Sequence, residues 1–319
     1  MVQIKAFDAL RPPPAYAPRV SSPPYDVIST EEARALAEGN PLSFLHVIRP
    51  EINLPVGTSL DDDAVYDSAA EGLTRLLEEG ALVRDAEPGI YLYRQAWKGR
   101  IQTGIVCCCH VDDYRHDAIR KHETTRKDKE DDRTRHLLAI DAHAGPVFLT
   151  FKKDHSIAAR IAEDSSHRPD YHFVSPDGVT HTAWRVSNPD RYVSLLAEVE
   201  NLYVADGHHR SASAERAASL KEGTNPNHTG HEEYNWFLSV LFPADDLTIL
   251  AYNRVVADLN GMTSSEFLDA LCEVGELAPA NEANPDQACS FGVYVDGSWW
   301  SLAIDQATIN WEDPIESLD

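Results

Sequence analysis

An apolar segment, a tight turn and an alanine-rich segment follow one another at residues 202–223. Residues 202–205 predict a buried strand, and Asp206-Gly207 is a dipeptide typical of tight turns. A helix is expected over about residues 211–221, with Gly223 at its end. Because this helix carries alanines at positions 212, 214, 217 and 218, it can pack close to a sheet. The chain is therefore expected to fold with helices packed on a sheet.

Strands and helices are expected to alternate irregularly along the rest of the chain, which favours an α+β fold with a mixed sheet over a doubly wound one. The proline-rich residues 1–30 predict an ordered coil. Other helices are predicted at 31–38, 63–79, 195–197 and 264–272. Other strands are predicted at 43–48, 90–97, 102–112, 147–151, 179–186, 236–242, 248–256, 290–295 and 299–304.

We expect three portions, either as separate parts or as one continuous domain. They are an N-terminal α/β portion at 1–112, a core at 113–258 that contains the 202–223 segment, and a C-terminal α/β addition at 259–319. The 319 residues are enough for a sizeable core.

The chain is strongly acidic, with 52 acidic and 28 basic residues and a formal net charge of −24. Duplex DNA binding usually requires a broad basic surface that displaces counterions, so this charge disfavours nucleic acid as a partner. A small anion is still compatible, because a few local donors suffice to bind it. The first residues do not resemble a signal peptide, and no apolar stretch approaches the length of a membrane span. We therefore expect a cytoplasmic protein that does not contact a membrane.

Three consecutive cysteines, Cys107 to Cys109, follow Ile105 and Val106. One interpretation is a metal or redox site, and the other is a buried strand filled by thiols that pack as small apolar groups. No C-x-x-C spacing exists outside this run, and adjacent strand residues point to opposite faces. These observations favour the buried strand, and no metal site is predicted. Five cysteines in all fit a reducing compartment.

The turn after residue 205 gathers groups that can hold an anion. Amides in the first turn of a helix lack partners within the helix, and the helix dipole favours negative charge there. Arg210 offers a two-pronged donor suited to phosphate, and His208 and His209 can donate hydrogen bonds or move protons. We predict a phosphate or nucleotide site made of Asp206, Gly207, His208, His209, Arg210 and Ser211.

Two other interpretations of this turn stay open. In the first, Asp206-Gly207 is only a turn and Arg210 forms a surface ion pair. In the second, Asp206, His208 and His209 bind a metal, although no clear further ligand follows at helical spacing. Clustered titratable groups often mark functional sites, which favours the phosphate site.

Residues 120–136 hold seven lysines and arginines in an otherwise acidic chain. A solvated helix with i,i+4 ion pairs would explain Lys129 to Arg133, but two threonines after Glu123 suit a helix poorly. Glu123 could act as a general base if it faces the anion site, and His122 and His208 are the other catalytic candidates. Further residues that could line a pocket, or equally serve as turns, caps and hydrogen-bond anchors, are Tyr25, Asp26, Lys121, Thr124, Arg133, Arg135, His136, Asn253 and Arg254.

Five separated motifs together resemble a bacterial and archaeal family, the domain of unknown function 1015 family. The resemblance runs from about residue 3 to beyond residue 260. Its motifs are Ala205-Asp206-Gly207-His208-His209-Arg210, Pro23-Pro24-Tyr25-Asp26-Val27, Asn40-Pro41-Leu42-Ser43-Phe44-Leu45-His46-Val47, Lys121-His122-Glu123-Thr124-Thr125 and Arg133-Thr134-Arg135-His136.

That family looks related to the ADP-dependent free serine kinases, which have a ParB/sulfiredoxin-like fold. The resemblance implies such a core at 113–258, with additions at both ends. It also implies that residues 206–210 hold nucleotide phosphates, that Glu123 takes the proton from a serine hydroxyl, and that ADP or ATP and Mg²⁺ are cofactors. Two departures are a longer span between Glu123 and Asp206, and Asn253-Arg254 where many relatives have His-Arg.

The leading functional hypothesis is a small-molecule kinase or related phosphotransferase that acts on free serine or a similar hydroxyl compound. The alternative is a non-catalytic nucleotide-binding regulatory module of the ParB-like type, which would keep the phosphate turn and need no base. A nucleic-acid-binding protein is a third hypothesis, supported only by residues 120–136. The oligomeric state is left open.

Overall fold

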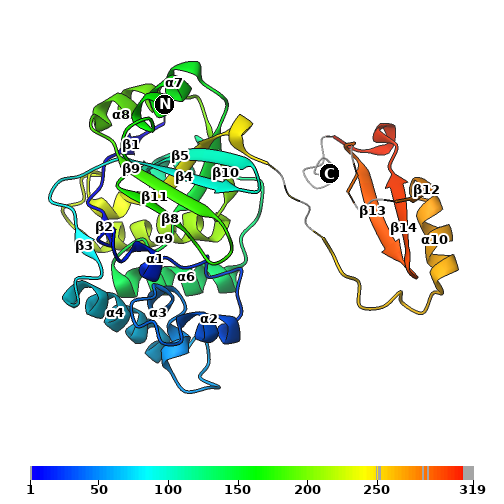
Figure 1. Cartoon of the computed structure of the whole chain (residues 1–319), viewed down its shortest axis with the longest axis horizontal. Coiled ribbons are helices and arrows are strands. Elements are labelled where there is room, and N and C mark those ends of the chain that lie inside the picture. Colours follow the sequence, from blue (N-terminus) through cyan, green and yellow to red (C-terminus); the bar gives the residue numbers. More distant parts are fainter. Residues whose placement is uncertain (1, 249, 251–252, 282–283, 286, 312–319) are drawn as a thin grey trace. The chain divides into compact units, whose positions relative to one another are not determined.

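The computed structural model describes residues 2–248, 250, 253–281, 284–285 and 287–311. The chain divides into two compact units, Met1–Leu247 and Thr248–Asp319. It is an α+β protein with one large mixed sheet, which confirms the expected fold class (Figure 1). Strands from both sides of residue 112 belong to that sheet, and the division between the units falls at residues 247 and 248.

A nine-stranded sheet forms the framework of the first unit. Its strand order is β6-β10-β7-β11-β5-β4-β9-β8, and β1 also pairs with β5. The pairs β6–β10 and β7–β11 are parallel and the others are antiparallel. The strands are β1 (Ile4–Lys5), β4 (Tyr91–Trp97), β5 (Arg100–His110), β6 (Ile119–Arg120), β7 (Val147–Phe151), β8 (Tyr171–Val174), β9 (Thr180–Arg185), β10 (Leu202–Asp206) and β11 (Trp236–Pro243), while β2 (Leu10–Arg11) and β3 (Val83–Arg84) form a separate pair.

The hairpin between β4 and β5 turns at Lys98-Gly99. Both residues have positive φ angles, 47° for Lys98 and 78° for Gly99. Two positive φ angles in a two-residue loop match the right-handed twist of the strands that the loop connects. Local turn chemistry therefore sets the register of these two strands.

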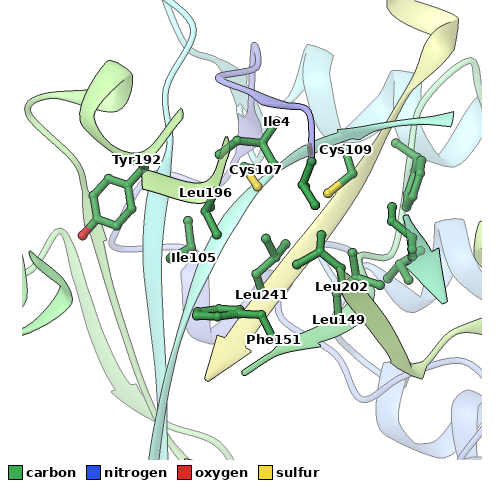
Figure 2. Packing of buried hydrophobic residues seen from close by; sticks show 14 of the residues in the cluster. Ile4, Ile105, Cys107, Cys109, Leu149, Phe151, Tyr192, Leu196, Leu202 and Leu241 are labelled. Carbon is green, nitrogen blue, oxygen red and sulfur yellow. The ribbon is translucent and has the colours of Figure 1, made fainter. Parts of the chain in front are cut away.

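The three cysteines lie in β5 and are all buried, which confirms the buried-strand interpretation. Cys107 and Cys109 point into the main core, whereas Cys108 points to the opposite face of the strand. Burial raises the pKa of the Cys108 thiol. Figure 2 shows the surrounding core side chains, which include Ile4, Ile105, Leu149, Phe151, Leu202 and Leu241.

In the view of Figure 1, helices lie on two sides of the first unit's sheet. Helices α7 and α8 lie above it, and α2, α3, α4 and α6 lie below it. A capping box between Ser29 and Glu32 starts α2, close to the predicted position. The helices are α1 (Ala17–Val20), α2 (Thr30–Ala37), α3 (Leu45–Ile48), α4 (Asp63–Glu78), α5 (Val111–Arg115), α6 (Lys127–Ile140), α7 (His155–Asp164), α8 (Pro189–Ala197) and α9 (His208–Thr224), with 3-10 turns η1 (Pro50–Asn53), η2 (Glu233–Asn235) and η3 (Ala244–Asp246).

The predicted strand at residues 43–48 is wrong, because residues Leu45–Ile48 form the helical turn α3. Leu45, Val47 and Ile48 are all buried, so this turn buries apolar side chains on several sides. A short apolar run without alternation cannot distinguish a buried strand from a buried helical turn. Packing against α4 decides the outcome here.

The second unit contains the helix α10 (Ser264–Cys272) and a three-stranded antiparallel sheet in the order β12-β14-β13. Its strands are β12 (Glu276–Ala280), β13 (Ser290–Val295) and β14 (Ser298–Ala303), followed by the 3-10 turn η4 (Gln306–Thr308). The predicted strand at 248–256 is absent from its described residues 248, 250 and 253–256, and its other residues lie outside the described ones. Across the described parts of both units, no helix has the length and apolar character to cross a membrane.

Candidate functional site

The turn between β10 and α9 is held in shape by two backbone features. The register of β10 against β7 shifts between Val204 and Asp206, which marks a bulge immediately before the turn. Gly207 then adopts the left-handed conformation with φ 95° and ψ 32°. The helix consequently begins at His208, three residues before the predicted start at Ser211. Both histidines and Arg210 therefore belong to its first turn.

The amides at the start of α9 are available to a ligand. The Ser211 amide donates to the Gly207 carbonyl oxygen at 2.9 Å, which begins the helical hydrogen bonding. Within the described structure no side chain caps this helix. The amides of His208, His209 and Arg210 precede the first helical bond, where helices commonly bind anions.

Arg210 already has partners on both sides of its guanidinium group. One terminal nitrogen pairs with the Asp206 carboxylate, and the other donates to the Pro146 carbonyl oxygen. The Arg210 side chain is 18% exposed, and its buried Nε has no hydrogen-bond partner. Asp206 is 63% exposed, so this ion pair lies at the surface. The structure thus contains the ion pair that one interpretation of the turn expected.

His208 connects the turn to the segment that carries Glu123. Its Nδ1 lies 3.6 Å from Glu123 Oε2, and its ring packs edge-on against His122 with ring centres 4.5 Å apart. The His208 side chain is 6% exposed and its Nε2 is buried without a hydrogen-bond partner, whereas Glu123 is 59% exposed. The structure therefore brings the three candidate catalytic residues together.

The electrostatics favour a neutral His208. Burial lowers the pKa of His208, and His122 acts in the same direction, while Glu123 opposes them. At 3.6 Å, the pair with Glu123 is longer than a normal hydrogen bond. A neutral imidazole beside an accessible carboxylate can accept or relay a proton, and Glu123 keeps oxygens open to solvent.

Two backbone contacts fix the other residues around the turn. The Arg126 amide donates to His209 Nε2 at 3.2 Å, which ties residues 121–126 to the start of α9. Ser211 is fully buried, and its hydroxyl lies 3.0 Å from the His208 carbonyl oxygen. It therefore faces its own helix, although the sequence predicts it among the phosphate-binding residues.

Tyr25 approaches the site from the N-terminal coil. The guanidinium group of Arg133 lies 4.3 Å from the centre of the Tyr25 ring, and Arg133 also pairs with Asp132 at 2.6 Å. Burial raises the pKa of Tyr25, while the charges of Arg133 and then Arg210 act to lower it. Tyr25 thus lies within electrostatic range of both Arg133 and Arg210.

Three other residues expected around a pocket, Arg135, His136 and Lys121, have partners within the fold. Arg135 pairs with Asp63 and lies over the Tyr66 ring at 4.0 Å, and His136 is buried with its Nε2 2.8 Å from the Val47 carbonyl oxygen. Lys121 donates to the Tyr114 carbonyl oxygen at 3.0 Å. Asp26 and Thr124 are exposed in the first unit, and Asn253 and Arg254 are exposed in the second.

Some contacts of the site have no clear signal in the sequence. The Pro146 carbonyl oxygen and the Arg126 amide both act through the backbone, so their residue types do not reveal them. Gly145 has a weak signal, because Gly-Pro pairs mark turns, and a Cβ atom there would lie 3.6 Å from the Arg210 Cδ. Across the described residues, no group of three or more His, Cys, Asp and Glu side chains could hold a metal ion.

The model of the family described as "Protein of unknown function (DUF1015)" matches residues 4–319. The chain belongs to this family. The match covers both units and every motif on which the resemblance rested. No curated protein and no solved structure matches the chain.

Membership of DUF1015 assigns no chemistry to the turn, because the family description names no activity. The chemistry of this DUF1015 chain must therefore follow from the geometry of its own residues. Two features of the site bear on its chemistry: the start of α9, which no side chain caps, and the contact of Glu123 with His208.

Proposed function

We propose that this protein is a small-molecule phosphotransferase that transfers a phosphoryl group from a nucleotide to a hydroxyl compound such as free serine. The observation that carries the proposal is the contact between Glu123 and His208 at the open start of α9. It puts a group that can accept a proton beside backbone donors that suit phosphate. A relationship to the serine kinases and a ParB/sulfiredoxin-like core belong to the same proposal.

Phosphate binding would use the first turn of α9. The amides of His208, His209 and Arg210 point out of the helix, and the helix dipole adds positive potential. The buried Nε2 of His208 and Nε of Arg210 lack partners among the described residues, so each could bond to a phosphate-bearing ligand. ADP or ATP is the donor that the family resemblance suggests.

Mg²⁺ would neutralise charge on the transferred phosphoryl group when bound. This ion usually keeps several waters and takes only one or two carboxylates besides the substrate phosphates. The absence of a larger ligand cluster from the described residues is compatible with such a site. Asp206, an exposed carboxylate at the turn, is the residue best placed to contribute to it.

Glu123 would act as the general base. As the hydroxyl oxygen of the acceptor bonds to phosphorus, the bond from phosphorus to the bridging oxygen breaks and the nucleotide leaves with its electrons. The hydroxyl proton passes to the Glu123 carboxylate. His208 positions that carboxylate from the helix side, and its neutral form avoids an ion pair that would reduce the basicity of Glu123.

The test compares Glu123→Gln with the wild type in a transfer assay with ADP or ATP, Mg²⁺ and free serine, read by mass spectrometry of the phosphorylated product. The substitution keeps the shape and removes the basic oxygen, so turnover should fall by about 10²–10⁴-fold. Nucleotide affinity measured by calorimetry should stay unchanged. Glu71→Gln, which alters an exposed carboxylate on α4, is the matched control and should retain full turnover.

Two results would contradict the proposal. Full turnover by Glu123→Gln would remove the base from the mechanism. Nucleotide binding without transfer to any hydroxyl compound in a panel of amino acids and polyols would favour the alternative, a nucleotide-binding regulatory module. That module would keep the helix start and need no base.

A further inference from the structure

A cavity of about 640 Å³, widely open to solvent, lies beside the segment that carries Glu123. Its position follows from the parallel pairing of β6 with β10, in which Ile119 is opposite Leu202 and Arg120 is opposite Tyr203. The cavity therefore lies at the beginning of these two strands, whereas the phosphate turn follows the end of β10. Its volume is in the range of small-molecule sites. The lining residues are His116, Asp117, Ala118, Arg120, Lys121 and Asn201.

Arg120 supplies a free donor surface in this cavity. Its Nε donates to Asn201 Oδ1 at 3.2 Å, which holds the plane of the guanidinium group. Within the described structure, its two terminal nitrogens have no hydrogen-bond partner. Two parallel N–H donors in one plane match the two oxygens of a carboxylate or a phosphate.

Lys121 adds a second positive charge in a fixed position. Its Nζ donates to the Tyr114 carbonyl oxygen at 3.0 Å and pairs with Asp117 at 2.9 Å. Asp117 is the only carboxylate among the lining residues, so Arg120 and Lys121 outweigh it. In a chain with a net charge of −24, a concave surface with this local excess of positive charge is suited to an anion.

The cavity is also close to the proposed base. Only His122 separates Lys121, which lines the cavity, from Glu123, which contacts His208. Arg120 itself is three residues from Glu123, and three residues of chain span at most about 11 Å even when fully extended. A molecule bound through an anionic group at Arg120 could therefore extend a hydroxyl group toward Glu123.

We infer that this cavity binds the oxyanion group, a carboxylate or a phosphate, of a small hydroxyl-bearing molecule, and that this molecule is the acceptor of the reaction. The acceptor role depends on the proposed function, whereas the anion site at Arg120 and Asn201 stands on its own contacts. Binding here and binding at the start of α9 can be measured separately, because a different arginine reports on each.

The test measures the rate at which phenylglyoxal modifies each arginine of the full chain, read by peptide mass spectrometry. Malonate and inorganic phosphate serve as the carboxylate and phosphate probes, with sodium chloride at matched ionic strength as the reference. At saturating probe, modification of Arg120 should slow by about tenfold, because the bound anion occupies the guanidinium nitrogens that phenylglyoxal must reach. Arg100, exposed at the β4–β5 hairpin, is the control and should keep its rate.

A variant of Asn201 tests whether this residue contributes to anion binding. Asn201→Ala removes the acceptor that holds Arg120, so the concentration of probe that gives half protection should rise by about fivefold, which is in the range of the net contribution of one hydrogen bond. Protection by malonate at the lower concentration assigns a carboxylate ligand, and protection by phosphate at the lower concentration assigns a phosphate ligand.

Two outcomes would overturn the inference. In one, neither probe protects Arg120, and in the other Arg100 is protected equally, which would show a general salt effect. Protection of Arg210 without Arg120 would remove the cavity site and leave the proposed phosphate turn intact. Protection of Arg120 without Arg210 by phosphate would support the cavity site and count against the phosphate turn.

Discussion

His136 lies in the core between α6 and α3, although the Arg-Thr-Arg-His run suggested that it lined a pocket. Its Nε2 donates to the Val47 carbonyl oxygen at 2.8 Å. The sequence could not reveal this placement, because α6 carries charged residues on several sides and gives a weak amphipathic pattern. Burial, followed by the charge of Arg133, lowers the pKa of His136 to about 4 from its ordinary value of 6.5.

This shift predicts a specific acid sensitivity. Between pH 6.5 and 4 the unfolded chain holds a proton on His136 that the folded chain does not hold, so the free energy of unfolding should fall as the pH drops through this interval. His136→Gln keeps a donor for the Val47 carbonyl oxygen and removes the titration. Between pH 7 and pH 5 it should lose less stability than the wild type, by on the order of 2 kcal/mol, in urea unfolding.

His155→Gln is the control, because His155 is exposed at the start of α7. Its loss of stability between the two pH values should match that of the wild type. Equal losses in wild type and His136→Gln would show that the buried imidazole does not cause the acid sensitivity.

At the scale of elements, α9 shows what local sequence can and cannot specify. The alanine-rich pattern predicts the helix, and Ala212, Ala214, Ala217 and Ala218 are all buried. The start of the helix was wrong by three residues because Gly207 supplies the left-handed turn that lets helical geometry begin at His208. The sequence contains that glycine, but only the bulge in β10 fixes where the turn ends.

The turn is expected to depend on glycine at this position. Gly207→Ala would force a side chain into a conformation with φ 95°, and the new Cβ would lie 3.2 Å from the Arg210 guanidinium carbon. We expect a loss of stability of about 1–2 kcal/mol in urea unfolding, together with weaker phosphate binding in calorimetry.

Gly223→Ala in the same helix is the matched control. Gly223 has ordinary helical geometry, and nothing lies within 4 Å of a Cβ atom built there. This substitution should leave stability unchanged or raise it by about 0.5–1 kcal/mol. If the two variants were equally stable, the left-handed turn would not be a structural requirement.

Other elements also differ in how far their neighbouring residues alone determine them. The hairpin at Lys98-Gly99, the capping box of α2 and the helix α10 were predictable because neighbouring residues determine them. The turn α3 was not, because a short apolar run fits a buried strand equally well. The helix α7 was missed although its signals are local, since Asp154 caps it and Ile157 and Ile161 lie on one face four residues apart.

At the scale of the whole molecule, the contacts that assemble the candidate site join distant parts of the chain. Glu123 reaches His208 because β6 runs parallel to β10, and Arg210 reaches Pro146 beside β7. Parallel pairing joins strands that are far apart in sequence, and no local pattern specifies it. The motifs could therefore be assigned to one site only through a family resemblance.

The division into two units predicts a site of proteolysis. The described residues between Leu247 and Ser264 form no helix or strand, and those at 253–258 are exposed. Limited digestion with proteinase K should first cut within 248–263 and leave a resistant fragment that ends near Leu247. The hairpin loop at Lys98-Gly99, exposed but held by strand pairing, should be cut more slowly. First cuts inside 2–247, located by mass spectrometry, would argue against two separate units.

The Asp206 carboxylate, which pairs with Arg210, competes with any anion that binds at the start of α9. The carboxylate occupies part of the donor surface that an incoming phosphate would use, and it is tethered only four residues away. A tethered rival has a high and constant effective concentration, so the apparent dissociation constant of any anion at this turn would include the equilibrium that detaches Asp206. A cation that draws Asp206 away would then bind cooperatively with the anion, and each would strengthen the binding of the other by the same factor.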